Sequence, residues 1–87
     1  MRVEITRFRV NTIMLERNDI IAHFNVRVGD FHIKAGTLRV PHDGGDPFIS
    51  MPGRKTAAIA IADPSETRDD ILDAVVARFR AETGRAP

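Results

Sequence analysis

The dipeptide Gly29-Asp30 separates two runs in which apolar and polar residues alternate. Alternation with a period of two is typical of strands that bury one face, and glycine in a two-residue connection supplies the positive φ of a tight hairpin turn. Counted outward from this turn, the facing residues are Val28 with Phe31, Arg27 with His32, Val26 with Ile33, and Asn25 with Lys34. Both strands then place their apolar residues on one side, which predicts an antiparallel hairpin with one buried face.

Shorter alternating segments extend this hairpin to a sheet of four to five strands within residues 1–62. Residues 3–10 predict a first strand whose apolar parity changes near Thr6, which indicates a bulge. Residues 11–19 are less regular and form a connection or the far end of a hairpin. Residues 41–47 form a loop, residues 48–51 a short strand, and residues 57–62 a last strand or an extended arm.

The parity of the apolar residues shifts again after Ala35, which we expect to face inward with Phe31 and Ile33. We place this shift at Gly36. Beyond it the inward residues are expected to be Leu38 and Val40, and the outward residues Thr37 and Arg39.

A single C-terminal helix is predicted at about residues 64–83. Asp63 and Pro64 provide an N-cap and a proline at the first helical position, residues 67–70 offer a second capping box about one turn later, and Gly84 is a C′ stop. The apolar residues of the helix fall on one stripe: Ile71, Leu72, Val75, Val76 and Phe79. We expect this stripe to pack on the sheet face of Phe24, Val26, Phe31 and Ile33. The fold class is therefore α+β, an antiparallel sheet of four to five strands with one helix on one face, in a single domain of residues 1–87.

Composition excludes several classes of protein. The chain has no cysteine, so it forms no disulfide framework and no thiolate metal site. Its longest apolar run is the six residues 57–62, far short of the roughly 20 that span a bilayer. The first residues alternate with charges and contain no signal-peptide core. We therefore expect a cytoplasmic protein without a membrane partner.

Catalytic and metal-binding patterns are weak. His42, Asp43 and Asp46 lie in a glycine-rich loop without the fixed geometry or spacing of a zinc or calcium site. No nucleophile lies in a recognisable context with a base, and Asp69 and Asp70 near the helix start repel phosphate. We expect no enzyme activity, no metal, no cofactor and no small-molecule substrate.

The sheet face opposite the helix is expected to be solvated and basic. Its residues, taken by parity, are Arg7, Arg9, His23, Asn25, Arg27, His32, Lys34 and Arg39. A face without carboxylates attracts phosphates by Coulomb forces and counterion release. Base stacking is not expected, because the phenylalanines lie at inward positions or in the 48–51 strand and the chain has no Trp or Tyr. The alternative is that these cations only cover a wet surface.

Charge is distributed unevenly along the chain, although the net charge is only +1. Residues 1–62 carry nine basic against six acidic side chains, and residues 63–87 carry four against six. An anionic partner is therefore expected to meet the sheet rather than the helix.

Several segments resemble the SpoVG family, named for stage V sporulation protein G. Residues 48–56, Phe-Ile-Ser-Met-Pro-Gly-Arg-Lys-Thr, resemble the family's Phe-Val-Ala-Met-Pro-Ser-Lys-Arg-Thr type of segment. Residues 61–64, Ile-Ala-Asp-Pro, resemble its Ile-Ala-His-Pro, and the pattern Arg68-x-x-Ile71-x-Asp73-Ala74-Val75 resembles its helix. With the first strand and the hairpin, the matches keep their order over roughly residues 1–80.

The resemblance implies a bacterial regulator that binds DNA or RNA, with a small antiparallel sheet, a C-terminal helix and a homodimer formed through strands. It places nucleic-acid contacts at Arg54, Lys55 and Arg68. The basic sheet face extends them with Arg7, Arg9, Arg27 and Lys34. Two departures weaken the binding part of the resemblance: a shortened segment at residues 56–60, and Asp69 and Asp70 beside the helix-start arginine.

A second hypothesis remains open. The chain is then a dimeric protein–protein interaction module that pairs a sheet edge, or the 57–62 segment, with a partner and binds no nucleic acid. The near-neutral net charge and the acidic helix favour this alternative.

Overall fold

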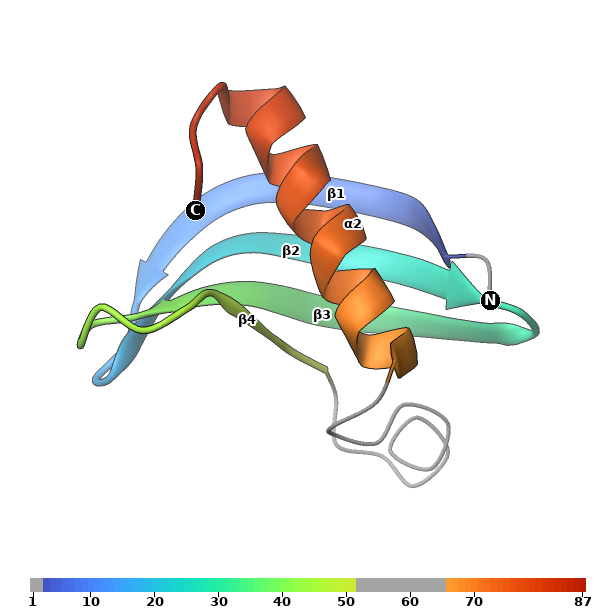
Figure 1. Ribbon diagram of the computed structural model, residues 1–87, viewed down its shortest axis with the longest axis horizontal. Helices are drawn as coiled ribbons and strands as arrows, with labels where there is room; N and C mark the ends of the chain where they lie inside the picture. The colour runs from blue at the N-terminus through green and yellow to red at the C-terminus, as the bar shows by residue number, and fades with distance from the viewer. Residues whose placement is uncertain (1–2, 52–65) are drawn as a thin grey trace.

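The computed structural model describes residues 3–51 and 66–87. Four strands precede one helix: β1 (Val3–Met14), β2 (Asn18–Val28), β3 (Phe31–Pro41), β4 (Phe48–Ser50) and α2 (Glu66–Thr83). The strands form an antiparallel sheet in the order β1-β2-β3-β4, and α2 lies across one of its faces (Figure 1). The predicted α+β fold is confirmed. The expected 57–62 strand and the expected N-cap at Asp63 and Pro64 lie outside the described residues.

The hairpin between β2 and β3 has the predicted register next to its turn. Val28 pairs with Phe31, Arg27 with His32, and Val26 with Ile33. Gly29 has a φ of 56°, the positive value for which a two-residue turn selects glycine.

The fourth predicted pair, Asn25 with Lys34, is wrong. Pairing resumes only at Phe24 with Gly36, so that Lys34 and Ala35 together lie opposite Asn25 in a bulge. Ala35 has a φ of 62° and is exposed rather than inward-facing. The parity shift therefore occurs one residue earlier than the sequence indicated.

Gly36 and Thr37, which follow the bulge, are both buried. A Cβ on Gly36 would lie 2.6 Å from the Phe24 ring, so only glycine fits beneath this ring. Thr37 lies on the outward side of the sheet with its partners His23 and Ser50, as expected, yet it is only 7% exposed. Its hydroxyl accepts a hydrogen bond from Arg39 Nε at 3.0 Å and donates to the Ser50 carbonyl at 3.4 Å.

Strand β1 contains the predicted bulge, because its pairing with β2 shifts between Ile5 and Arg7. A second shift, between Val10 and Ile13, was not predicted. Residues 11–14 continue β1, and a turn closed by the Leu15 N–H on the Asn18 carbonyl at 3.0 Å leads into β2. Of the two alternatives for residues 11–19, the far end of a hairpin is the one observed.

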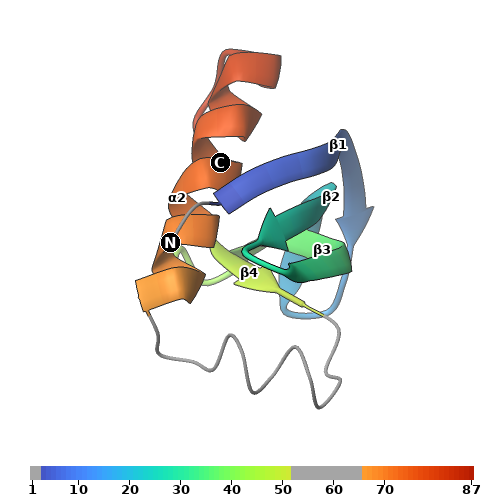
Figure 2. The ribbon, with the colours of Figure 1, turned by 90° about the vertical axis from the view of Figure 1, so that its right-hand side faces the viewer.

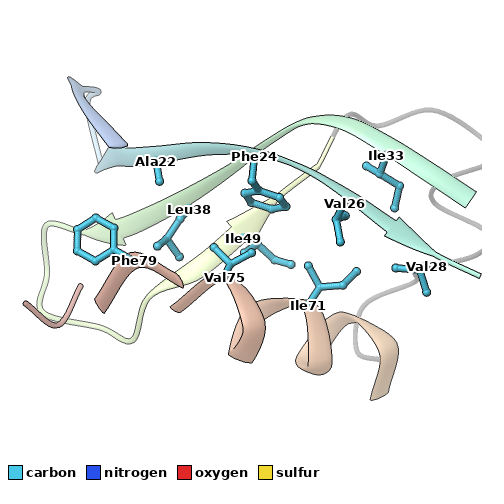
Figure 3. Packing of buried hydrophobic residues seen from close by; sticks show 10 residues of the cluster. All are labelled: Ala22, Phe24, Val26, Val28, Ile33, Leu38, Ile49, Ile71, Val75 and Phe79. Atoms are coloured by element: carbon cyan, nitrogen blue, oxygen red, sulfur yellow. The ribbon is translucent and has the colours of Figure 1, made fainter. Parts of the chain in front are cut away.

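The core lies between α2 and the sheet (Figure 3). As predicted, the helix contributes Ile71, Val75 and Phe79 as buried residues, with Leu72 and Val76 half-buried beside them. The sheet contributes Ala22, Phe24, Val26, Val28, Ile33, Leu38 and Ile49. Each large apolar side chain buried here contributes about 1.5–3 kcal/mol.

Phe31 is not part of this core, contrary to expectation. It is 43% exposed, since it directly follows the turn at the end of the β2–β3 hairpin. At the other end of the fold, Gly84 ends α2 as predicted. Its φ is 70° and its N–H donates to the Arg80 carbonyl at 2.8 Å.

Candidate nucleic-acid interface

The sheet has a face that no described element covers. Figure 2 shows α2 against one side of the strands only; we call the opposite side the outer face. The alternation that buries Phe24 and Val26 beneath α2 places His23, Asn25 and Arg27 of β2 on the outer face. The helix thus determines which set of side chains meets solvent.

A shallow depression of about 330 Å³ lies in the middle of the outer face. Its lining consists of Arg7, Arg9, His23, Phe24, Asn25, Lys34 and Ala35. Arg7 pairs with Asn25 and Arg9 with His23, while Lys34 belongs to the bulge on the other side of Asn25. Cations from β1 and β3 therefore flank His23 and Asn25 on β2.

The spacing of these cations follows from the sheet. Neighbouring strands lie about 4.8 Å apart, so the backbones that carry the β1 arginines and Lys34 are separated by about 10 Å. Arg7 and Arg9, two residues apart on one strand, are about 7 Å apart at their Cα atoms. Side chains as long as these reach a shared anion across such distances.

The three cationic heads are available for a ligand. Among residues 3–51 and 66–87, Arg7, Arg9 and Lys34 form no hydrogen bond or ion pair through their side chains, and all three are exposed. The lining contains no carboxylate. Like charges about 7 Å apart repel each other by roughly 0.6 kcal/mol even in water, and an anion placed between them replaces this repulsion with attraction.

The polar residues on the floor of the depression are held in place. Nδ1 of His23 donates to Oδ1 of Asn11 at 2.8 Å, which leaves Nε2 of the ring for a ligand. Oδ1 of Asn25 accepts from the Ala35 N–H at 3.1 Å, which leaves the amide NH₂ as a donor. The floor therefore offers positioned hydrogen-bonding groups between the flanking cations.

Arg27 and His32 lie on the outer face but not in the depression. Nη1 of Arg27 is 4.0 Å from Oε1 of Glu4, and Nε2 of His32 is 2.9 Å from Oγ1 of Thr6. The prediction of a carboxylate-free face is therefore wrong at Glu4, which pairs with Arg27 across β1 and β2. The signal was present in the sequence, because Glu4 alternates with the inward residues Val3 and Ile5.

Arg68, one of the three residues carried over from the family resemblance, is not brought together with this depression. Arg54 and Lys55 lie outside the described residues. Arg68 is half-buried at the start of α2, and its Nη2 donates to the Ile49 carbonyl at 2.7 Å. This bond ties the helix to β4, on the side of the sheet away from the depression.

Two features of the site carried no signal in the sequence. Asn11, in the segment that appeared irregular, orients His23, and the bulge at Ala35 places Lys34 beside Asn25. A positive φ is uncommon for alanine, so the residue type of Ala35 does not indicate the bulge.

In the 42–47 loop, His42 Nε2 lies 2.8 Å from Asp19 Oδ1. Among the described residues no group of three potential ligands is placed to hold a metal ion.

Comparisons with protein-family models, curated proteins and solved structures found no match. The resemblance to the SpoVG family therefore stays a prediction from the sequence. In the part of the chain that the structure describes, no helix is long and apolar enough to cross a membrane. The fold and the outer face define a small α+β domain with an open, locally basic sheet.

Proposed function

We propose that this protein is a nucleic-acid-binding regulator of the SpoVG-like type, located in the cytoplasm, that contacts the phosphates of DNA or RNA with basic residues. One observation carries the proposal: Arg7, Arg9 and Lys34 meet around a depression whose lining has no carboxylate. The phosphodiester backbone is a repeating anion that such a cluster attracts. The regulatory role is what the sequence resemblance implies.

Affinity then comes mainly from phosphate contacts. A protein that neutralises three phosphates shows a slope of log Kobs against log salt of about −2 to −3. Arg27 adds less, because Glu4 partly neutralises it. The resemblance implies three further phosphate contacts, at Arg54, Lys55 and Arg68.

The experiment is fluorescence polarisation with labelled single-stranded and duplex oligonucleotides over a salt series. The variant Arg7→Gln/Arg9→Gln/Lys34→Gln removes the cations of the depression. The matched control, Arg17→Gln/Arg80→Gln/Arg85→Gln, removes the same charge from exposed positions outside the lining. An Arg54→Ala/Lys55→Ala variant tests the residues implied by the resemblance.

We expect the depression variant to bind at least about tenfold more weakly, with a salt slope flatter by about 2–3. The control is expected to lose less affinity, because its charges act only at long range. Absence of binding to either form of nucleic acid at low salt would reject the proposal.

A homodimer is part of the proposal, and the edge of the sheet favours it. Among the strands that the structure describes, β1 is an edge strand of 12 residues, and exposed apolar side chains cluster near its end: Val10, Ile13, Met14 and Leu15. An exposed apolar edge strand favours pairing with another strand. Sedimentation at increasing protein concentration tests this, and a monomer at the highest concentration would contradict it.

The same edge supports the second candidate, a dimeric protein–protein interaction module without nucleic-acid binding. The response of the binding affinity to salt distinguishes the two candidate functions. Added salt weakens a complex held by phosphate contacts and leaves an apolar strand-mediated complex nearly unchanged.

A further inference from the structure

Phe48 lies on the outer face, one row of paired residues away from the row of Arg9 and His23 in the depression. In β4, Ile49 is buried against the helix side, so Phe48 and Ser50 on either side of it point to the outer face. Phe48 pairs with Arg39 of β3 and remains 37% exposed. A large aromatic ring is thus presented to solvent on the same surface as Arg7, Arg9 and Lys34.

Arg39, which faces Phe48, has a restrained guanidinium group. Its Nε donates to Oγ1 of Thr37 at 3.0 Å, and its Nη1 donates to Oδ1 of Asn18 at 3.5 Å. Planar guanidinium groups and aromatic rings are the two kinds of side chain on which unpaired bases stack. The pair therefore offers two adjacent planar groups at one edge of the outer face.

The pair is close enough to the depression for one ligand to reach both. Ser50, Thr37, His23 and Arg9 form the next row across the four strands. Rows lie about 7 Å apart and strands about 4.8 Å apart, so Phe48 is about 12 Å from His23. A segment of a few nucleotides covers this distance.

We infer that Phe48 and Arg39 form a base-stacking platform beside the phosphate-binding depression, and that the nucleic acid bound here is single-stranded. This inference rests on the proposed function. In a duplex the base faces are covered by stacking, so a ring on an open sheet meets them only in an unpaired strand. The one helix among the described residues lies on the opposite face. The outer face therefore presents no helix that could enter the major groove of a duplex. Base stacking was not expected from the sequence, and Phe48 was not among the predicted site residues.

The absence of Trp and Tyr from the chain gives a direct test. Phe48→Trp introduces a single fluorophore at the platform and keeps an aromatic ring there. The matched control is Phe31→Trp, since Phe31 is also exposed, at 43%, but pairs with the core residue Val28 and lies on the helix side of the sheet. We expect a single-stranded oligonucleotide to quench the fluorescence of the Phe48→Trp variant and not that of the Phe31→Trp variant.

Affinity provides the second readout. Phe48→Leu keeps an apolar side chain and removes the ring, so binding of a single-stranded oligonucleotide is expected to weaken by about 5- to 150-fold. Phe31→Leu is expected to leave binding unchanged. A duplex of the same sequence is expected to bind more weakly than the single strand and to be insensitive to both substitutions.

The outcomes separate this inference from the proposed function. Salt-sensitive binding without quenching at position 48, or with equal affinity for duplex and single strand, would overturn the stacking platform and leave the phosphate contacts standing. Binding to neither form at low salt would overturn both. Quenching that is confined to the Phe48→Trp variant, together with weaker binding of Phe48→Leu, would support the platform.

Discussion

Oδ1 of Asn25 accepts a hydrogen bond of 3.1 Å from the backbone N–H of Ala35, directly beneath the basic depression. The bond joins the middle of β2 to the bulge of β3, where Ala35 has a φ of 62°. A left-handed conformation costs a non-glycine residue roughly 1–2 kcal/mol, so the surrounding sheet must maintain it. The same bulge places Lys34 at the edge of the depression.

Ala35→Gly is expected to raise the free energy of unfolding by about 0.5–1 kcal/mol. Glycine adopts positive φ without the clash of a Cβ, and this gain exceeds the extra backbone entropy that glycine loses on folding. Urea unfolding monitored by circular dichroism measures the change. Ala35→Val serves as the opposite control, because a β-branched side chain is disfavoured at positive φ and lowers stability. Equal destabilisation by both substitutions would contradict the assigned backbone strain.

Asn25→Asp is expected to weaken oligonucleotide binding and to leave the stability of the fold nearly unchanged. The carboxylate keeps an oxygen to accept the Ala35 N–H, so the free energy of unfolding changes by less than about 1 kcal/mol. It also places a negative charge beside Arg7 and Lys34, and binding of an oligonucleotide is expected to weaken by about tenfold at low salt. Fluorescence polarisation and urea unfolding on the same samples test both parts. Unchanged affinity would argue that the ligand does not enter the depression.

Gly36→Ala is expected to lower the free energy of unfolding by about 1–3 kcal/mol. The added Cβ would lie 2.6 Å from the Phe24 ring in the core, and such overpacking forces side chains or backbone to move. A double-mutant cycle with Phe24→Leu tests the cause, because a smaller side chain makes room for the methyl group. Strict additivity of the two substitutions would contradict the direct contact.

Arg68→Ala is expected to lower the free energy of unfolding by about 1–2 kcal/mol. The substitution removes the 2.7 Å bond to the Ile49 carbonyl that ties α2 to β4. Thermal unfolding measures the loss, and Arg85→Ala, at an exposed position after the helix, is the control. If stability is unchanged while oligonucleotide binding falls, Arg68 acts as the nucleic-acid contact that the family resemblance implies.

The sequence predicted those elements whose residue types carry a geometric signal. Gly29-Asp30 defined the central hairpin and its first three pairs, the parity change marked the bulge at Thr6, and Gly84 marked the end of α2. These predictions succeeded because alternation and positive-φ glycine are local properties that one stretch of chain reveals.

Other features depended on contacts between distant segments. The bulge at Ala35 shifted the pairing that alternation alone predicted, because alanine gives no sign of a left-handed backbone. The three residues of β4 were too few to indicate which side Phe48 takes; Ile49 determines it by entering the core. The hydrogen bond of Arg68 to Ile49 joins residues 19 positions apart, and no local pattern indicates it.

The position of β2 between β1 and β3 has a consequence for how this surface can change over evolution. The arginines of β1 and Lys34 of β3 are held apart by backbone ladders to the strand between them. Exchanging any of these side chains alters the charge at that point and leaves the distance between the points unchanged. The sheet thus keeps the spacing of the binding positions fixed, so a new ligand preference requires substitutions at these positions but no new fold.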